Sequence, residues 1–195
     1  VVFREFAAAS LEGGARAERV ILENGDRLEA DLVLVGTGVR PATDFLQGIE
    51  PREDGGLAVD SGLRVTDGLF AAGDVAAFLL NGQPTRIEHW RLAQEHGRVA
   101  ARNMIGANDS YVGVPFFWTY HYTQRFEYLG HAKQWDEERL VGDLESLRFV
   151  MLLVKDGHVA AAIACGRERA MAGLLDLMRS PVRVDEALRL LESLG

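Results

Sequence analysis

The chain has 195 residues, of which 48% are hydrophobic, so it holds enough apolar material for one or two packed domains. Its 29 acidic side chains outnumber its 21 basic ones, and the formal net charge of −8 argues against nonspecific binding to nucleic acid or to an anionic membrane. The longest apolar run, residues 149–154, is too short to span a bilayer. The single cysteine, Cys165, cannot form an internal disulfide, so we expect a cytoplasmic protein in which it is a small buried side chain of a strand.

The first part of the chain is predicted to be an antiparallel meander with strands at residues 2–9, 17–23 and 27–29. Asn24-Gly25 is a strong hairpin turn because both residue types tolerate a positive φ. The continuous apolar run at residues 31–36 indicates a strand buried on both faces of a parallel sheet. A short helix or turn is expected at residues 43–49.

Short strands are predicted next at residues 57–60, 63–65 and 69–72. The last strand ends at Gly73-Asp74, where a helix pattern is expected to begin, and residues 81–84 are expected to form a loop. A helix is predicted over residues 90–105, with small residues at helical spacing on one face. That stripe consists of Ala93, Gly97, Ala100, Ala101 and Met104.

The turn residues at 108–110 mark a predicted domain boundary, after which an α+β unit follows. Four strands are expected, at residues 114–120, 126–130, 147–154 and 158–164, with a hairpin turn at 155–157. Two helices follow, at residues 168–178 and from Asp185 onward, separated by Pro181. The acidic run at 136–138 is interpreted as a solvated turn. The five histidines show no spacing typical of a metal site.

Residues 68–76 (GLFAAGDVA) carry the most informative chemistry of the chain. Gly73 lacks a Cβ, so another molecule can approach its backbone closely. The carboxylate of Asp74 can accept hydrogen bonds from sugar-like hydroxyls, or it can cap a following helix through the backbone amides. Both roles remain open from the residues alone.

Residues 33–41 (VLVGTGVRP), 68–76 and 86–90 (RIEHW), in this order and spacing, resemble the FAD-dependent pyridine nucleotide oxidoreductases. Within that group the chain is most similar to the ferredoxin-reductase and apoptosis-inducing-factor-like branch. The resemblance implies an α/β plus α+β fold with two dinucleotide-binding domains and a small C-terminal domain. It assigns 1–45 to the end of the nicotinamide-binding domain, 46–110 to the C-terminal segment of the FAD-binding domain, and 111–195 to the reductase C-terminal α+β domain.

The resemblance also implies roles for individual glycines and for the aspartate. Asp74, next to Gly73, would accept a hydrogen bond from a hydroxyl of the FAD ribityl chain. Gly36 and Gly38 would lie where the chain crosses back toward the flavin domain and passes close to the dinucleotide. The alternative for these two glycines is an ordinary tight turn between a strand and a loop.

Two aromatic segments complete the expected cofactor-binding residues. In the resemblance, Glu88, His89 and Trp90 open the long helix at the flavin ring, with Glu88 either near the nicotinamide or at the helix cap. The amides of that helix N-terminus would favour electron density on a reduced flavin. Trp118, in the segment 115–118 (PFFW), would border the flavin and nicotinamide pocket, or would belong to the aromatic core of the small domain.

The predicted function is FAD-dependent transfer of hydride from NADH or NADPH, followed by single-electron transfer to an iron–sulfur protein such as a ferredoxin, a rubredoxin or a Rieske centre. No Gly-x-Gly-x-x-Gly turn occurs, so we expect the chain to be the C-terminal part of a longer reductase and to be inactive alone. The catalytic step requires no side-chain nucleophile. The alternatives are an NADH oxidase or peroxidase-like enzyme and a noncatalytic interaction module; a homodimer is left open.

Overall fold

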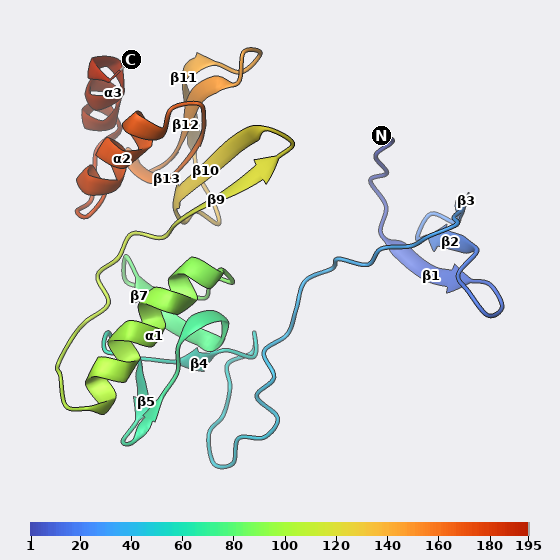
Figure 1. Ribbon diagram of the computed structural model, residues 1–195, viewed down its shortest axis with the longest axis horizontal. Helices are drawn as coiled ribbons and strands as arrows, with labels where there is room; N and C mark the ends of the chain where they lie inside the picture. The colour runs from blue at the N-terminus through green and yellow to red at the C-terminus, as the bar shows by residue number, and fades with distance from the viewer. Residues whose placement is uncertain (195) are drawn as a thin grey trace. The chain divides into compact units, whose positions relative to one another are not determined.

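The structure is a computed structural model that describes residues 1–194 and has a mixed α/β fold (Figure 1). It divides into two compact units, residues 1–40 and the chain from Pro41 onward, which we describe separately. In the described part of the chain, no helix combines the length and the apolar character that crossing a bilayer requires.

The first unit is a three-stranded antiparallel sheet of β1 (Ala8–Glu12), β2 (Arg19–Leu22) and β3 (Arg27–Glu29). Arg19 in the central strand faces Glu12 and Glu29 on either side, with N–O distances of 3.2 and 2.7 Å. The expected hairpin at Asn24-Gly25 is present, although only Gly25 has a positive φ, 88°. The meander is therefore confirmed.

The second unit begins with small sheets that support one long helix, α1 (Trp90–Met104). β4 (Leu57–Ala58) pairs in parallel with β7 (Ala76–Leu80), which pairs antiparallel with β8 (Gln83–Thr85); β5 (Arg64–Thr66) and β6 (Leu69–Phe70) form a separate ribbon. The core between these strands and the helix includes Leu57, Leu63, Phe78 and Leu92, none more than 5% exposed. The predicted helix is confirmed, but Met104 of the small-residue stripe is 62% exposed.

The C-terminal part is a five-stranded antiparallel sheet in the order β11-β12-β13-β10-β9. Helices α2 (Glu168–Leu177) and α3 (Val184–Ser193) cover one face of this sheet (Figure 1). Its strands are β9 (Phe116–His121), β10 (Gln124–Gly130), β11 (Glu137–Asp143), β12 (Arg148–Lys155) and β13 (His158–Cys165). Cys165 is 1% exposed in β13, as predicted.

The segment between α1 and this domain is fastened by one amide side chain. Asn103 donates to the carbonyls of Gly62 (2.8 Å) and Asp109 (2.9 Å), and it accepts from the amide of Asp109 (2.8 Å). The amide of Tyr111 donates to the carbonyl of Ser61 at 2.8 Å. The chain after α1 is thus held against the β5 region before it enters the C-terminal domain.

Two predictions for the first unit are wrong: one strand has other bounds than predicted, and one predicted strand is absent. The first strand is Ala8–Glu12 rather than residues 2–9, because the short β2 offers ladder partners only to the later residues. Residues 31–36 form no strand, and Leu34 is 94% exposed. A parallel strand needs a neighbour on each side, and no described strand pairs with this segment.

The helix pattern expected after Gly73-Asp74 is also wrong, because a single 3-10 turn leads directly into the strand β7. A short apolar run does not distinguish a helix from a buried strand by periodicity, and here the parallel ladder with β4 decides for the strand. The loop expected at 81–84 is a tight hairpin: Leu80 pairs with Gln83, and Asn81 and Gly82 have φ values of 51° and 77°.

The acidic run at 136–138 is wrong as a turn, because Glu137 and Glu138 begin β11. This strand lies at the edge of the five-stranded sheet, where one side of its backbone faces no further strand. Charged side chains are common on such edges because they oppose pairing with another chain. The composition of this segment is therefore typical of a solvent-exposed turn, although its backbone forms an extended edge strand.

Candidate functional site

Gly73 and Asp74 lie in the 3-10 turn Gly73–Val75, directly before β7. Gly73 has a φ of 75°, and a Cβ placed on it would come within 2.9 Å of the Cβ of Ala93 in α1. The glycine is therefore needed for close packing of the helix against the turn. The turn is capped by Ala72 without a side-chain hydrogen bond, so the alternative of Asp74 as a helix cap is not what the structure shows.

The residue that caps α1 is His89, whose Nδ1 accepts a hydrogen bond from the backbone amide of Arg91 at 3.2 Å. Burial and the charge of Arg91 lower the pKa of His89, and the nearby carboxylate of Asp74 opposes that shift. Because an imidazole must keep Nδ1 unprotonated to accept this bond, its neutral form suits the cap. Asp74 and the start of α1 therefore belong to one electrostatic site.

Glu88 does not cap the helix; it pairs with Arg86, with 2.8 Å between Arg86 Nη2 and Glu88 Oε1. The guanidinium of Arg86 also donates to the backbone carbonyl of Asp74 at 2.6 Å and lies 3.6 Å from Asp54. Gly56 makes room for it, because a Cβ at that position would lie 2.6 Å from Arg86 Cδ. Arg86 thus fastens the Asp74 turn to the start of α1.

Sequence reasoning placed Arg86 in a motif but assigned it no role. Its side chain is only 14% exposed, and a guanidinium buried to that degree needs several acceptors. The spacing of Arg86 and Glu88 was the available clue, since residues two apart in an extended segment lie on the same face.

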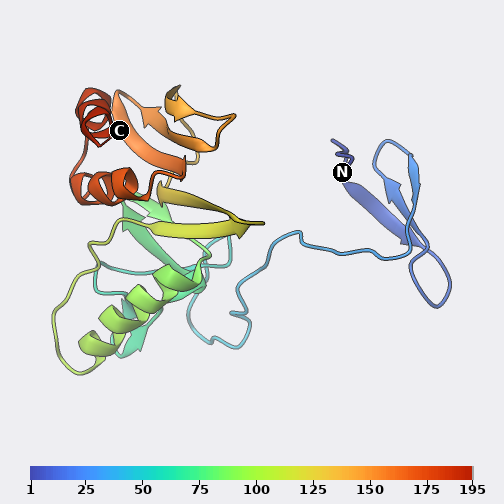
Figure 2. The same cartoon turned by 45° about the horizontal axis from the view of Figure 1, so that its top comes forward.

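The structure brings the two aromatic segments together at the N-terminal end of α1, which approaches β9 (Figure 2). The ring of His89 stacks on Phe117, with centroids 4.5 Å apart and an interplanar angle of 25°. Trp90 meets Trp118 edge to face at 5.9 Å. We call His89, Trp90, Phe117 and Trp118 the aromatic cluster. Trp90 remains 56% exposed, so it leaves an indole surface free for a flat partner.

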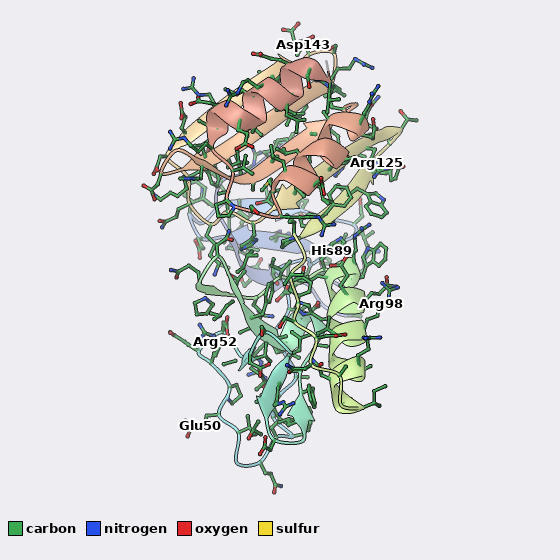
Figure 3. The ribbon with its side chains drawn as sticks, turned by 90° about the vertical axis from the view of Figure 1, so that its left-hand side faces the viewer. Glu50, Arg52, His89, Arg98, Arg125 and Asp143 are labelled. Atoms are coloured by element: carbon green, nitrogen blue, oxygen red, sulfur yellow. The ribbon has the colours of Figure 1, made fainter. Side chains whose placement is uncertain are left out.

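Trp118 is also held by two guanidinium groups. Arg125 lies 4.9 Å and Arg91 5.4 Å from the centre of its ring, within the range of cation–π attraction. Figure 3 labels Arg125 on the C-terminal domain, and His89 and Arg98 at the start and further along α1. Arg125 is in turn paired with Glu127 at 2.6 Å. Burial raises the pKa of the Glu127 carboxyl group, while the charge of Arg125 acts in the opposite direction.

Arg125 and Glu127 were not among the site residues predicted from the sequence. Glu127 pairs with Trp118 in the ladder between β9 and β10, and Arg125 lies two residues away on the same face. The register of that hairpin was the missing information, because a shift by one residue would place both charges on the other face.

Gly36 and Gly38 lie in the first unit, whereas the other six predicted site residues lie in the second. A Cβ would meet nothing within 4 Å at either glycine; Gly38 alone has a positive φ, 93°. Within the second unit, the structure brings together Gly73, Asp74, Glu88, His89, Trp90 and Trp118. Within residues 1–194, no group of three histidine, cysteine or acidic side chains is arranged to hold a metal ion.

Comparisons with known proteins identify the family of the chain. The family model described as pyridine nucleotide-disulphide oxidoreductase matches residues 4–97, and the model described as reductase C-terminal matches residues 116–190. Apoptosis-inducing factor 3 of Mus musculus is 32% identical over 171 residues, which cover 85% of this chain and 28% of that protein. The ferredoxin–NAD(+) reductase component of the anthranilate 1,2-dioxygenase system of Burkholderia cepacia is 36% identical over 166 residues, covering 82% and 40%.

A solved structure of similar fold is the ferredoxin reductase for the CYP199A2 system from Rhodopseudomonas palustris. It has a TM-score of 0.83 and 26% identity, over 96% of this chain and 49% of that one. The chain thus spans about half the length of that structure and less than half of the curated relatives it matches. Taken together, the two family models and the fold show that the chain belongs to the pyridine nucleotide-disulphide oxidoreductase family, in the ferredoxin-reductase and apoptosis-inducing-factor-like branch.

Proposed function

We propose that the protein is a FAD-dependent oxidoreductase that takes hydride from NADH or NADPH and passes electrons to an iron–sulfur protein. In this proposal residues 1–45 end the nicotinamide-binding domain, 46–110 are the C-terminal segment of the FAD-binding domain, and 111–195 are the C-terminal domain. The carrying observation is the convergence of Asp74 and the aromatic cluster at the start of α1.

The residues present fit a flavin nucleotide. The carboxylate of Asp74 is exposed and accepts no hydrogen bond from the described residues, so it is available to a ribityl hydroxyl. The exposed indole of Trp90 offers a flat apolar surface beside that carboxylate. Bound FAD would supply the acceptance of a hydride and the release of single electrons.

The protein's own groups would position the cofactor and shape its surroundings. The N-terminus of α1 carries a partial positive charge that favours electron density nearby. Arg86 holds that helix start against the Asp74 turn, so the two binding elements keep a fixed spacing. Trp118, oriented by Arg91 and Arg125, would form a wall that excludes water from the nicotinamide side.

The acceptor is proposed from the relatives. The Burkholderia cepacia relative is named as the ferredoxin–NAD(+) reductase component of a dioxygenase system, and a further relative from Sphingomonas is named ferredoxin–NAD(P)(+) reductase. Both names point to a ferredoxin-type partner. Whether the acceptor is a ferredoxin, a rubredoxin or a Rieske centre is the finer part of the proposal.

The first test concerns Asp74 in the flavin-loaded protein. Asp74→Ala should weaken flavin binding about 10- to 100-fold, because a charge-assisted hydrogen bond contributes roughly 1.5–3 kcal/mol. Flavin content and the flavin dissociation constant, measured by fluorescence, give the result. Asp67→Ala is the matched control, since Asp67 is a fully exposed carboxylate in the β5–β6 turn. Equal flavin affinity in the two variants would refute the role of Asp74.

The second test concerns Trp118. Trp118→Ala in the same flavin-loaded protein should slow the reduction of the flavin by NADH. The melting temperature should change little, because the expected loss is in hydride transfer rather than in folding. Trp135→Ala serves as the control, because Trp135 is 43% exposed and lies outside the aromatic cluster. Stopped-flow absorbance measures the reduction rate. An unchanged rate and nicotinamide affinity in a folded variant would leave Trp118 as a packing residue of the C-terminal domain.

A further inference from the structure

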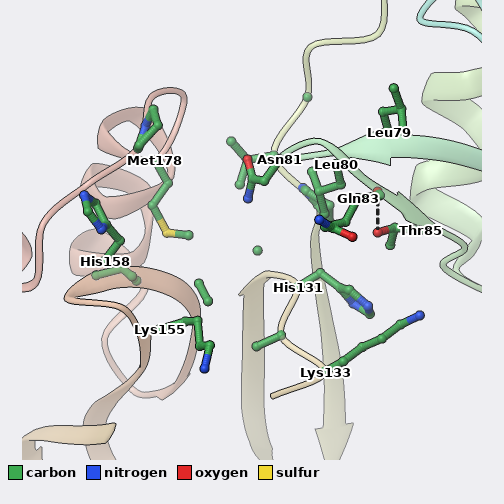
Figure 4. A pocket seen from close by; sticks show the side chains of 18 of the residues that line it. Leu79, Leu80, Asn81, Gln83, Thr85, His131, Lys133, Lys155, His158 and Met178 are labelled. Carbon is green, nitrogen blue, oxygen red and sulfur yellow. Dashed lines mark hydrogen bonds between the residues drawn. The ribbon is translucent and has the colours of Figure 1, made fainter. Parts of the chain in front are cut away.

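A cavity of about 990 Å³ lies between the β7–β8 hairpin and the C-terminal domain (Figure 4). Five separate segments line it: the β7–β8 hairpin, residues 111–115, residues 130–134 after β10, the β12–β13 hairpin and the loop after α2. It shares no residue with the aromatic cluster or with the turn that carries Asp74. It is therefore a separate feature from the proposed flavin site.

The distribution of charge around this cavity is one-sided. The chain has 19 arginines but only two lysines, Lys133 and Lys155, and both line the cavity. His131, His158 and Arg179 line it as well. Among the residues that the structure describes, none of the acidic side chains contributes to the lining, although they outnumber the basic ones in the whole chain. Such a lining favours a negatively charged occupant.

Two of these groups lack a protein partner. Lys155 pairs with Asp136 at 2.6 Å, and Arg179 pairs with Asp176 at 3.3 Å, so both charges are partly neutralised. Lys133, by contrast, makes no ion pair within residues 1–194. The Nε2 atom of His131 is buried and has no hydrogen-bond partner there. In Figure 4 the side chains of His131 and Lys133 extend in the same direction, and they are near enough for the charge of Lys133 to act on the imidazole of His131.

In the tautomer that carries the proton on Nε2, the unpaired buried N–H of His131 costs free energy that a hydrogen-bond acceptor would recover. The neighbouring ammonium group favours an acceptor that is negatively charged. The rest of the lining is largely apolar and includes Leu80, Pro84 and Met178, which suit the aliphatic or aromatic body of a molecule. A volume near 1,000 Å³ is at the upper end of the range for small-molecule sites.

We propose that this cavity binds a small organic anion, with a phosphate or carboxylate head at Lys133 and His131 and an apolar body against Leu80, Pro84 and Met178. The site would act independently of the flavin, because it shares no residue with the aromatic cluster. Its ligand is defined by this chemistry: a single anionic group joined to an apolar ring or chain.

The scarcity of lysine allows a direct test on the protein as it stands. Reductive methylation with ¹³C-formaldehyde labels the two lysines and the N-terminal amine, and it keeps their charge. Phenyl phosphate is the probe, phenol its uncharged control, and the amine of Val1 the internal reference. Saturable shifts of the lysine methyl signals with phenyl phosphate, absent with phenol, are expected. Equal shifts with phenol, shifts shared by Val1, or no saturation would overturn the proposal.

Variants locate the anionic head. Lys133→Gln should weaken phenyl phosphate about 10- to 100-fold, as expected for a lost charged hydrogen bond, with affinity followed by the remaining Lys155 signal. Arg98→Gln is the matched control, because Arg98 is exposed on α1, outside the cavity, and its loss changes the net charge equally. A similar loss in both variants would show a nonspecific charge effect and refute the site. His131→Phe should weaken binding as well, and unchanged affinity would exclude its Nε2 as a contact.

Discussion

The meander of residues 1–40 and the C-terminal sheet are both antiparallel, but residues 1–40 contain no helix of their own, whereas α2 and α3 pack on the C-terminal sheet. In the meander, Leu22 is the one buried side chain among residues 1–40. In the C-terminal domain, fourteen buried residues from the sheet, from α2 and α3 and from the segment between these helices form a continuous core, including Leu152 and Leu174 at 0% exposure. Hydrogen-bonded strands alone leave apolar side chains in water; a covering layer is what buries them.

The difference shows what an apolar pattern reports. Leu32, Leu34 and Val35 are 87%, 94% and 65% exposed, although their sequence is that of a strand buried on both faces. The pattern encodes burial against partners, and no described element supplies those partners. In the C-terminal domain the same kind of run, β12, is covered within the chain, so pattern and burial agree.

The largest expected effect is on hydrogen exchange. Amides of β12 and β13 should exchange at least about 100-fold more slowly than those of β1–β3, because core strands open only with global unfolding. Amide exchange followed by NMR or mass spectrometry measures this. Residues 112–195 expressed alone should retain the slow amides, and residues 1–40 alone should show none. Comparable protection in the two sheets would contradict the conclusion that the covering helices stabilise the C-terminal sheet.

The next largest effect is expected on the free energy of unfolding, when a buried leucine and an exposed leucine are each replaced by alanine. Leu174→Ala in α2 is expected to lower the free energy of unfolding by about 2–5 kcal/mol, because it removes a fully buried side chain and leaves a cavity. Leu34→Ala should change it by less than about 0.5 kcal/mol, since this side chain is already in water. Chemical denaturation followed by circular dichroism gives both values. A cost for Leu34→Ala near that of Leu174→Ala would show that residues 31–36 are buried in solution.

The most gradual effect is a pH dependence confined to the second unit. His96 in α1 is 0% exposed, and burial lowers its pKa to about 4. In the unfolded chain, the pKa of His96 has its ordinary value near 6.5. The contribution of the neutral imidazole to the free energy of unfolding is therefore fully present above pH 6.5. It is lost as pH falls from 6.5 to 4, by at most about 1.4 kcal/mol per pH unit.

Melting temperatures across this range test the assignment. Compared with the parent chain, His96→Leu should show a flatter profile between pH 6.5 and 4, because it has no proton to gain. The amides of α1, the helix that carries His96, should lose protection over the same pH range, whereas exchange in residues 1–40 should not respond to it. An identical pH slope in the variant would assign the dependence to other groups, such as His131, whose pKa burial also lowers.

Local turn chemistry made much of the C-terminal domain predictable. Asp156 and Gly157 form the expected hairpin turn, with φ values of 49° and 73°, and the strands on either side follow. β7 was missed because a short apolar run is ambiguous until its ladder is known. β11 was missed because an edge strand tolerates charges that elsewhere indicate a loop.

The site was predictable where the residues are close in sequence or match a family motif. Asp74, His89, Trp90 and Trp118 are indeed brought to one place, and their roles at a flavin remain a proposal. Arg125, by contrast, reaches Trp118 through strand register and three-dimensional packing. The sequence around Arg125 therefore gives no indication that its guanidinium packs on the ring of Trp118.

The clamp made by Asn103 has a mechanical consequence. Because its amide fixes the end of α1 to Gly62 and Asp109, the chain cannot flex freely before Tyr111, whose own amide is tied to Ser61. On the other side, the carbonyl of Pro115 is anchored by the amide of Gly130 at 2.7 Å. The covalent link to the C-terminal domain is thus reduced to a tether of three residues, 112–114, too short to let that domain swing far from the helix it packs beside.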